Sequence, residues 1–383
     1  MSTIGYTHQG IILFLKELKI KLNKPARTLL AWLMVALLEK TRAHLFRLAE
    51  KLPDDEASDK ARQQRIRRFL SNRLICPRLF ISAIVSMIRP LVEHLDTLEL
   101  VIDRTEWIRR GVPVNVLDVG ISYQGRALPL FWMVTNRRGS SGFEAWKQVL
   151  GPTIEALRAT DWTQGKHLHV NADREFASPK LSEWLIETYR VGSTLRLKRS
   201  EYINSEYESQ PVRDYLSRLK PGQCRFLRHQ TVTQNSEFVM NIALWWKKGY
   251  CEPWALMTTH THFTRTIASY KQRFGIEPMH KDWKTNAFDI EGTRMTNAKR
   301  ISTMLIPIVL CYILCMLEGK RKEISGEATS SHRGKRTTGL FLSGLSAFCR
   351  ILRTTQLTRL KAFFSRTFTQ WLWPERLAMT LSS

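Results

Sequence analysis

Apolar and polar positions divide the chain into a helical part and a strand-rich part. Residues 11–22 and 28–48 carry apolar side chains at the three- and four-residue spacing of amphipathic helices. From about residue 98 the pattern changes to short apolar runs separated by glycines and polar turns, which is typical of strands. We therefore predict a helical N-terminal domain over residues 1–95, followed by a domain built on a sheet.

Predicted strands and helices follow a definite order in the second part. Three consecutive strands precede a helix, a fourth strand, a second helix and a fifth strand. The strand-like runs cover residues 98–103, 112–123, 126–135, 167–172 and 191–197. This order is typical of a mixed α/β fold. We predict one domain over residues 96–318, with a β-rich insertion at about 200–260 and a basic C-terminal region over 319–383.

The charge of the chain indicates an acidic partner. Its 383 residues include 59 Lys and Arg against 34 Asp and Glu, a formal net charge of +25. Because 43% of the residues are hydrophobic, the chain can bury a globular core and is not a disordered basic tail. Nucleic acid is the usual partner of so basic a protein. A membrane surface fits less well, because the basic residues are spread along the whole chain.

Neither a membrane span nor a zinc site is expected. The apolar run 301–317 contains Pro307 and is shorter than the roughly 20 residues that a span needs, so we predict a buried core helix. Residues 1–10 are polar and predict no signal peptide. The six cysteines form no C-x-x-C pair, which argues against a zinc site and favours reduced thiols. We therefore predict a cytoplasmic protein.

The most basic predicted helix lies at residues 59–78. It holds seven Lys and Arg against the single acid Asp59, and it has an apolar side. One interpretation is an amphipathic helix with a solvated charged face. The other is a helix whose charges lie against nucleic-acid phosphates. In the second interpretation residues 1–95 form a DNA-binding domain, and the candidate contacts are Arg62, Arg65 and Arg68.

Two aspartates follow predicted strands. Asp103 ends the apolar run LELVID, and Asp173 follows the run HLHVNA. A carboxylate at the end of a buried strand is costly unless a partner or a cation receives it. If the two strands are neighbours, both carboxylates emerge at the same edge of the sheet. Each aspartate taken alone is also consistent with a turn or a helix cap.

A third acid lies in the segment YKQRFGIEPMHKDWK, residues 270–284. At about 100° per residue, five side chains of this segment fall within roughly 80° of one helix face. They are Tyr270, Arg273, Glu277, Lys281 and Lys284. A solvated charged face explains the charges but not the tyrosine. Because Pro278 disfavours helical angles at the residue before it, the helix either kinks there or begins anew.

The two aspartates and this segment together resemble a known family. The spacing Y-x2-R-x3-E-x6-K begins at Tyr270, and Asp173 lies in the context ADREF. Both features are similar to motifs of the insertion-sequence-four family of DDE transposases, which carries a Y-R-E-K signature. The resemblance covers roughly residues 96–318 and is weak at both ends of the chain.

The resemblance implies a ribonuclease-H-like mixed sheet with the first acid on the first strand, the second after the fourth strand and the third on a later helix. It also implies a β-rich insertion between the second and third acids, which are 104 positions apart. The implied catalytic residues and ligands of Mg²⁺, with Mn²⁺ as an alternative cation, are Asp103, Asp173 and Glu277. The implied DNA contacts beside the cut are Tyr270, Arg273 and Lys284, with Lys281 added from the same predicted helix face.

The function that the resemblance implies is DNA transposition by cut and paste. Such an enzyme binds double-stranded terminal inverted repeats, hydrolyses a phosphodiester at each element end and joins the freed ends to target DNA. We expect a dimer in the DNA complex, located with the bacterial nucleoid and not at a membrane. Two alternatives stay open: a nuclease of the same fold that cuts without joining, and a catalytically silent DNA-binding protein derived from a transposase.

Overall fold

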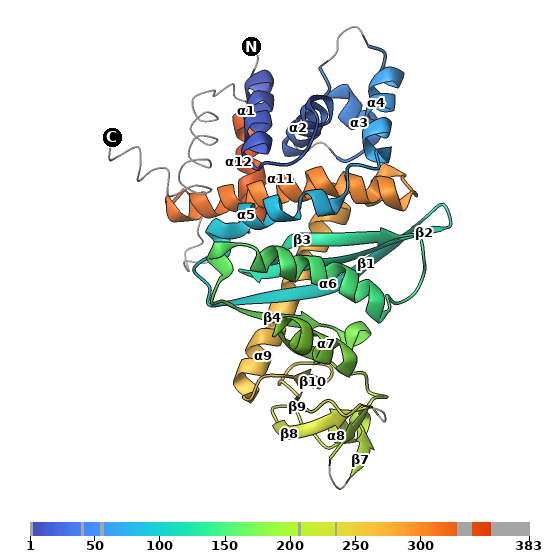
Figure 1. Ribbon diagram of the computed structural model, residues 1–383, viewed down its shortest axis with the longest axis vertical. Helices are drawn as coiled ribbons and strands as arrows, with labels where there is room; N and C mark the ends of the chain where they lie inside the picture. The colour runs from blue at the N-terminus through green and yellow to red at the C-terminus, as the bar shows by residue number, and fades with distance from the viewer. Residues whose placement is uncertain are drawn as a thin grey trace.

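Helices gather at one end of the molecule, and a sheet forms most of the rest (Figure 1). The computed structural model describes residues 3–39, 42–53, 57–205, 208–233, 236–327 and 339–353. The first elements are α1 (Thr3–Glu17), α2 (Lys24–Leu38), α3 (Leu45–Glu50), α4 (Asp59–Ser71), η1 (Pro77–Leu79) and α5 (Ile81–Val92). Asn23 and Ser58 begin α2 and α4, because each side chain accepts a backbone N–H from the first turn. Every element described before residue 95 is helical, as the apolar spacing predicts.

Ten strands form one mixed sheet, in the order β3-β2-β1-β4-β5-β10-β9-β8-β6-β7. They are β1 (Thr97–Arg109), β2 (Val112–Tyr123), β3 (Arg126–Thr135), β4 (His167–Ala172), β5 (Gly192–Arg196), β6 (Tyr202–Asn204), β7 (Ser209–Pro211), β8 (Cys224–Val232), β9 (Met240–Trp245) and β10 (Trp254–Thr258). Strands β1 to β3 form an antiparallel meander, and β4 runs parallel to both β1 and β5. The predicted mixed α/β class is confirmed.

Strand β1 is longer than the apolar run at its start predicts. The run ends at Asp103, but the strand continues to Arg109 because β2 pairs with it over that whole length. The hairpin then turns at Arg110 and Gly111, both of which have a positive φ. Asp103 therefore lies within a strand, and the prediction that it ends one is wrong.

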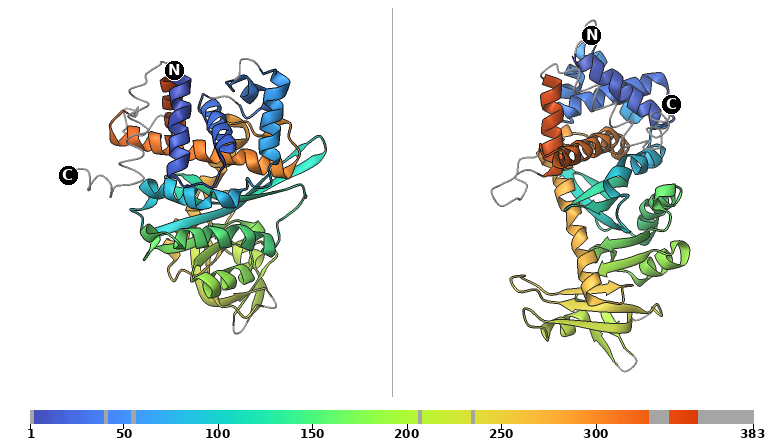
Figure 2. Two further views of the ribbon diagram at one scale, coloured as in Figure 1. Left: turned by 45° about the horizontal axis from the view of Figure 1, so that its top comes forward. Right: turned by 90° about the vertical axis from the view of Figure 1, so that its left-hand side faces the viewer.

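The predicted β-rich insertion extends the central sheet instead of forming a separate one. Strand β10 pairs antiparallel with β5, and β9 and β8 continue the sheet beyond it. The short helix α8 (Val212–Ser217) and the β6–β7 pair complete this end. Figure 2 shows these strands at the end of the molecule opposite the N-terminal helices.

The remaining helices cover the sheet and join it to the helical end. Those in the first half of the sheet region are α6 (Phe143–Arg158), η2 (Asp161–Thr163), η3 (Arg174–Phe176) and α7 (Pro179–Tyr189). A continuous helical column follows β10, and it comprises α9 (Phe263–Lys271), η4 (Gln272–Gly275), α10 (Ile276–Lys281) and η5 (Asp282–Asn286). The column runs alongside the sheet toward the N-terminal helices (Figure 2). The last elements are η6 (Glu291–Thr293), α11 (Ala298–Ile324) and α12 (Leu340–Arg353).

Helix α11 forms the core of the helical end. Within the described part of the chain it is the one helix long and apolar enough to cross a membrane, and 94% of its apolar window is buried inside the molecule. It packs against α2, α5, α12 and β3. The apolar run is therefore a core helix, as predicted. Of the predicted basic C-terminal region, residues 328–338 and 354–383 lie outside the described residues.

Candidate active site

The neighbouring strands β1 and β4 bring the two predicted aspartates together. Their parallel register ends with the pair Ile102 and Ala172. The next residue on β1 is Asp103, and the next residue after β4 is Asp173. Both carboxylates therefore lie just beyond the last β1–β4 pair, where β4 ends and β1 continues beside β2. Their closeness is the arrangement expected if the two strands are neighbours.

The third acid reaches this edge on the helical column, which is held close to β2 and β3. Ser122 donates a hydrogen bond to Gln272 at 2.9 Å, and Arg126 forms an ion pair with Asp282. A Cβ atom at Gly275 would lie 2.8 Å from the backbone carbon and oxygen of Arg126, so only glycine allows this approach. The column thus crosses the sheet at backbone contact distance.

The column is not one regular α-helix. It passes from α-helix through a 3₁₀ turn in η4, back to α-helix in α10, and into a π-helical turn in η5. Pro278 lies in the first turn of α10, where its missing N–H has no helical acceptor to lose. A constant 100° per residue therefore does not hold, and the prediction of a single face from residue 270 to residue 284 is wrong.

All three predicted acids surround the guanidinium of Arg273. The guanidinium donates to Glu277 Oε1 at 2.7 Å and to Asp103 Oδ2 at 3.3 Å, and it lies 3.9 Å from Asp173 Oδ2. Only 6% of this arginine side chain is exposed, against 56% for Glu277. Burial alone would lower the pKa of Arg273, but Tyr270 and the three carboxylates raise it overall. Arg273 therefore stays positively charged among the three acids.

Tyr270 supports the second aspartate from within the core. Its hydroxyl donates to Asp173 Oδ1 at 3.3 Å, and its ring is fully buried against Trp254 and Phe274. Burial and the neighbouring carboxylate raise the pKa of this phenol, so it stays protonated and able to donate. In this structure Tyr270 and Arg273 contact carboxylates and do not take the exposed position that a direct phosphate contact requires. Their burial against the sheet is the physical reason.

A second buried acid stands behind Asp103, and sequence reasoning missed it. Asp118 lies directly opposite Asp103 in the β1–β2 register, is 0% exposed, and pairs with His280 at 2.7 Å. Burial alone would lower the pKa of His280, but Asp118 and then Asp103 raise it overall, which favours the protonated imidazole. The available signal was an aspartate inside the otherwise apolar run 112–123.

Burial dominates the protonation of Asp103. Its pKa is raised because the carboxyl is removed from water, and His280, Arg273 and the backbone N–H of Arg104 oppose that rise. A carboxyl with a raised pKa beside a buried cationic pair is typical of functional sites, although structural ion pairs produce it too.

Lys284 of the predicted signature and the added Lys281 lie at the rim of the site. Lys284 forms an ion pair with Glu291 at 2.8 Å, donates to the backbone oxygen of Glu106 at 3.1 Å and lies over the ring of Trp107. Lys281 is exposed. The two lysines are thus nearer to solvent than the tyrosine and the arginine of the same segment.

The chemistry of the acids suits a hard cation, since carboxylate oxygens are the ligands that Mg²⁺ prefers. In the described ranges, no three His, Cys, Asp or Glu side chains lie close enough together to hold one ion. At the predicted acids, Arg273 occupies the space between the carboxylates. The predicted metal ligands are therefore gathered at one place, with a guanidinium where a cation would lie.

Helix α4 carries the other predicted DNA contacts. Arg65 and Arg68 are exposed, and Arg62 pairs with Asp59 at 2.5 Å. The opposite side of the helix is buried through Ile66, Phe69 and Leu70. The helix is amphipathic, as the sequence predicts, and its arginines face outward.

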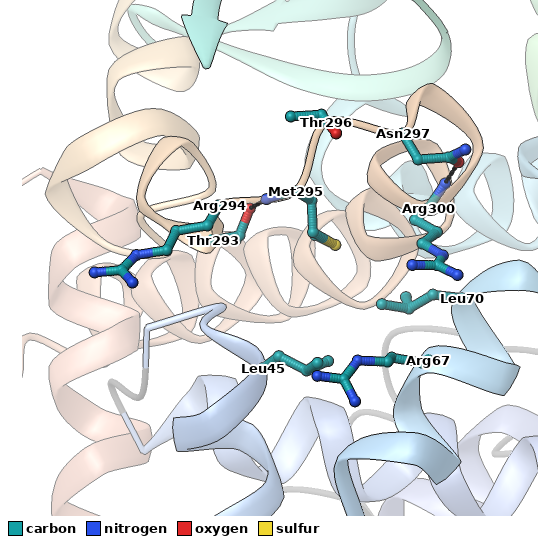
Figure 3. Close-up of a pocket in the computed structure, with 9 residues that line it drawn as sticks. All are labelled: Leu45, Arg67, Leu70, Thr293, Arg294, Met295, Thr296, Asn297 and Arg300. Atoms are coloured by element: carbon teal, nitrogen blue, oxygen red, sulfur yellow. Dashed lines mark hydrogen bonds between the residues drawn. The ribbon is translucent and has the colours of Figure 1, made fainter. Parts of the chain in front are cut away.

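A basic cavity of about 260 Å³ lies between α4 and the segment that leads into α11 (Figure 3). Arg67 and Leu70 of α4 face Met295 and Arg300 across it, and Arg294 extends away from them. None of the nine lining residues is acidic. Sequence reasoning counted Arg67 among the charges of the helix but did not identify this cluster, because its other members are distant in the chain.

Two comparisons with known proteins found no match. No protein-family model matches the chain, and no curated protein matches it.

Proposed function

We propose that this chain is a DDE-type DNA transposase with a ribonuclease-H-like core. The observation that carries the proposal is the meeting of Asp103, Asp173 and Glu277 around one guanidinium, although 174 positions separate the first acid from the last. The first acid lies on β1, the second follows β4 and the third lies on α10. The resemblance to the insertion-sequence-four family implies this same placement.

The donor set supports Mg²⁺ as the cofactor, with Mn²⁺ as an alternative. Asp103, Asp173 and Glu277 would hold the cation, because they offer only hard oxygen atoms. The proposed chemistry uses two such cations: one would activate the attacking oxygen of a phosphodiester cleavage, and the other would stabilise the leaving oxygen.

Tyr270 and Arg273 organise the carboxylates. The guanidinium offsets the mutual repulsion of the three acids, and the tyrosine hydroxyl orients Asp173 toward them. A guanidinium pairs with phosphate oxygens in the same forked geometry that it uses for carboxylates. A phosphate contact by Arg273 therefore requires that DNA binding first expose this buried side chain. In the proposed reaction, water attacks the phosphodiester in the first cut, and the freed 3′-hydroxyl attacks target DNA in the joining step.

The basic surfaces provide the DNA contacts of the proposal. Arg65 and Arg68 project from α4, and the neighbouring cavity adds Arg67 and Arg300 without any acid in its lining. Cations arranged in this way neutralise several phosphates, so binding should weaken steeply as salt rises. The proposed partners are the terminal inverted repeats and the target duplex, and the proposed assembly is a dimer on DNA.

A second candidate is a DNA-binding protein that does not cleave. The observation in its favour is Arg273, which occupies the space among the acids that a metal ion would need. A nuclease of the same fold uses the same acids and differs from a transposase only in joining. Cleavage and joining must therefore be measured separately.

The test uses full-length protein, Mg²⁺ and linear duplexes cut from the DNA that flanks its coding sequence. Wild-type protein should cleave these duplexes at the element ends and join the products to a plasmid. The Glu277→Gln variant should bind the duplexes within about twofold of wild type and show no detectable cleavage, because the change removes a charge from the proposed metal site only.

The matched control is Glu291→Gln, which removes a carboxylate that pairs with Lys284 at the rim. It should still cleave. Binding without cleavage by wild-type protein favours the second candidate, and cleavage without joining favours the nuclease. If Glu277→Gln cleaves at the wild-type rate, the assignment of the third acid is wrong.

A further inference from the structure

A second basic cavity lies at the opposite edge of the sheet from the acids. Its volume is about 340 Å³, and it is bounded by the first residues of β1, β4 and β5, the end of α6 and the segment between β10 and α9. Thr97 and Asp103 are six residues apart on β1, so the two edges are separated by about 20 Å at ~3.3 Å per residue. The cavity is therefore distinct from the candidate active site.

The charged residues that line this cavity are all cationic. Of its eleven residues, four are Lys or Arg, three are His and none is Asp or Glu. The polar side chains that matter are Arg158, Lys166, His167, Arg190, His260 and Arg265. The nearest acid described in contact with any of them is Glu99, which lies 3.7 Å from Arg265.

Two of the cations are held by the protein, and two are not. Lys166 donates to the backbone oxygens of Glu93 and Leu95 at 2.6 and 2.7 Å, and Arg265 donates to Thr97 at 3.0 Å. The guanidiniums of Arg158 and Arg190 make no hydrogen bond or ion pair with any residue that the structure describes. Both are exposed at the mouth of the cavity. They are thus available to a ligand.

The inner wall is a rigid pair of imidazoles. His169 and His260 stack with ring centres 4.0 Å apart and planes inclined by 9°, and His169 also bonds to Thr194 at 2.8 Å. Burial lowers the pKa of His260 to about 4 and that of His169 well below its usual value, so both rings are neutral near pH 7. The buried Nε2 of His260 has no partner within the described ranges. This neutral ring can therefore accept or donate one hydrogen bond.

We propose that this cavity binds the phosphate group of a ligand, with Arg158 and Arg190 as its principal partners. Guanidinium forks pair two phosphate oxygens at once, and a pocket without acids lets two of them act on the same group. A cavity of about 340 Å³ accepts a phosphate with one attached nucleoside but not a duplex. The source is either a free nucleotide or the terminal phosphate of a DNA strand. The proposal does not rest on transposase activity.

Binding of deoxyadenosine 5′-monophosphate to the full-length protein tests the proposal by calorimetry. Wild-type protein should bind one equivalent, and the double variant Arg158→Gln/Arg190→Gln should bind at least tenfold more weakly. The matched control is Arg218→Gln/Arg225→Gln, which removes the same charge from exposed positions directly after α8 and on β8 and should leave binding unchanged. Equal weakening by both double variants, or no saturable binding by wild type, would overturn the proposal.

Two duplexes of one sequence, with and without a 5′-phosphate, distinguish the sources. A preference of the wild type for the phosphorylated end, lost in Arg158→Gln/Arg190→Gln and kept in the control, identifies a DNA end as the ligand. Loss of nucleotide binding without any end preference identifies a free nucleotide. Neither readout depends on Mg²⁺ or on cleavage, so this result stands apart from that of Glu277→Gln.

Discussion

The sheet edges at the two ends of the parallel strands β1 and β4 carry opposite charge, and the protein itself neutralises that charge at one edge only. At one edge the acids Asp103 and Asp173 follow the paired part of β1 and β4, and a buried arginine lies between them. At the other edge arginines surround a cavity without acids, and two of them have no partner in the described part of the chain. Ion pairs within the protein neutralise the first edge, whereas the second edge keeps two guanidiniums exposed to solvent.

The histidines of the two edges show the same contrast. Burial lowers the pKa of His280, but Asp118 beside it raises that pKa overall, which favours the imidazolium. His260 is buried beside Arg265, and its pKa falls to about 4. The pKa of the same residue type thus moves up at the acidic edge and down at the basic edge. The charged neighbour, and not burial alone, therefore decides the direction in which the pKa of a buried histidine shifts.

The largest effect should follow from removing the arginine at the acidic edge. Arg273→Ala leaves three carboxylates facing one another, and breaking a buried ion pair in this way costs roughly 3–5 kcal/mol of unfolding free energy. Mg²⁺ should then raise the melting temperature of the variant more than that of wild type, because the cation can take the vacated position. Thermal unfolding with and without Mg²⁺ measures both effects.

Arg225→Ala, an exposed change on β8, serves as the control and should leave both measurements at wild-type values. If Mg²⁺ stabilises wild type and Arg273→Ala equally, the guanidinium does not occupy a metal position. Arg273 and the three carboxylates would then be a purely structural ion-pair cluster, and the contrast between the edges would say nothing about function.

The local pattern of apolar residues predicts well where the strands lie and predicts poorly which strands pair. Apolar runs place the first five strands because the period of side chains in a strand is local. The continuation of β1 past Asp103 depends on β2, and the joining of β10 to β5 links residues about 60 positions apart, so neither can be seen in a short window. Motif spacing likewise named the three acids without indicating that Arg273 would lie among them.

The helical column shows why the rest of the site escaped prediction. Equal rotation per residue assumes one helix type, but close contact between Gly275 and β3 is accompanied by 3₁₀ and π-helical turns on either side. Tyr270 is consequently buried and Lys281 exposed, although both fall on one predicted face. His280, which lies in the same segment, was not singled out because its partner Asp118 is 162 positions away.

A glycine at each edge allows an intermediate test. The Cβ of Gly275→Ala would meet the Arg126 backbone at 2.8 Å, and a paired strand cannot move, so we expect a loss of about 1–3 kcal/mol. The Cβ of Gly192→Ala would meet side-chain atoms of Thr259 and His169 at 2.7 and 2.8 Å, which can shift in part. Denaturant unfolding should therefore show a smaller loss for Gly192→Ala. Nucleotide binding should weaken only in that variant, and weakening in both would contradict the separation of the two edges.

The smallest effect is the pH dependence of stability, and its sign should differ between the edges. The folded pKa of His280 is raised above 6.5, so its contribution is complete below pH 6.5 and is lost as pH rises through the folded pKa. The folded pKa of His260 is lowered to about 4, so its contribution is complete above pH 6.5 and is lost as pH falls toward 4. Melting temperatures from pH 4 to pH 9 should show a shallower loss of stability on the alkaline side for His280→Gln. For His260→Gln the shallower loss should fall on the acid side. If His280→Gln changes the acid side instead, the imidazole beside Asp118 is neutral, and the charge assigned to the acidic edge is wrong.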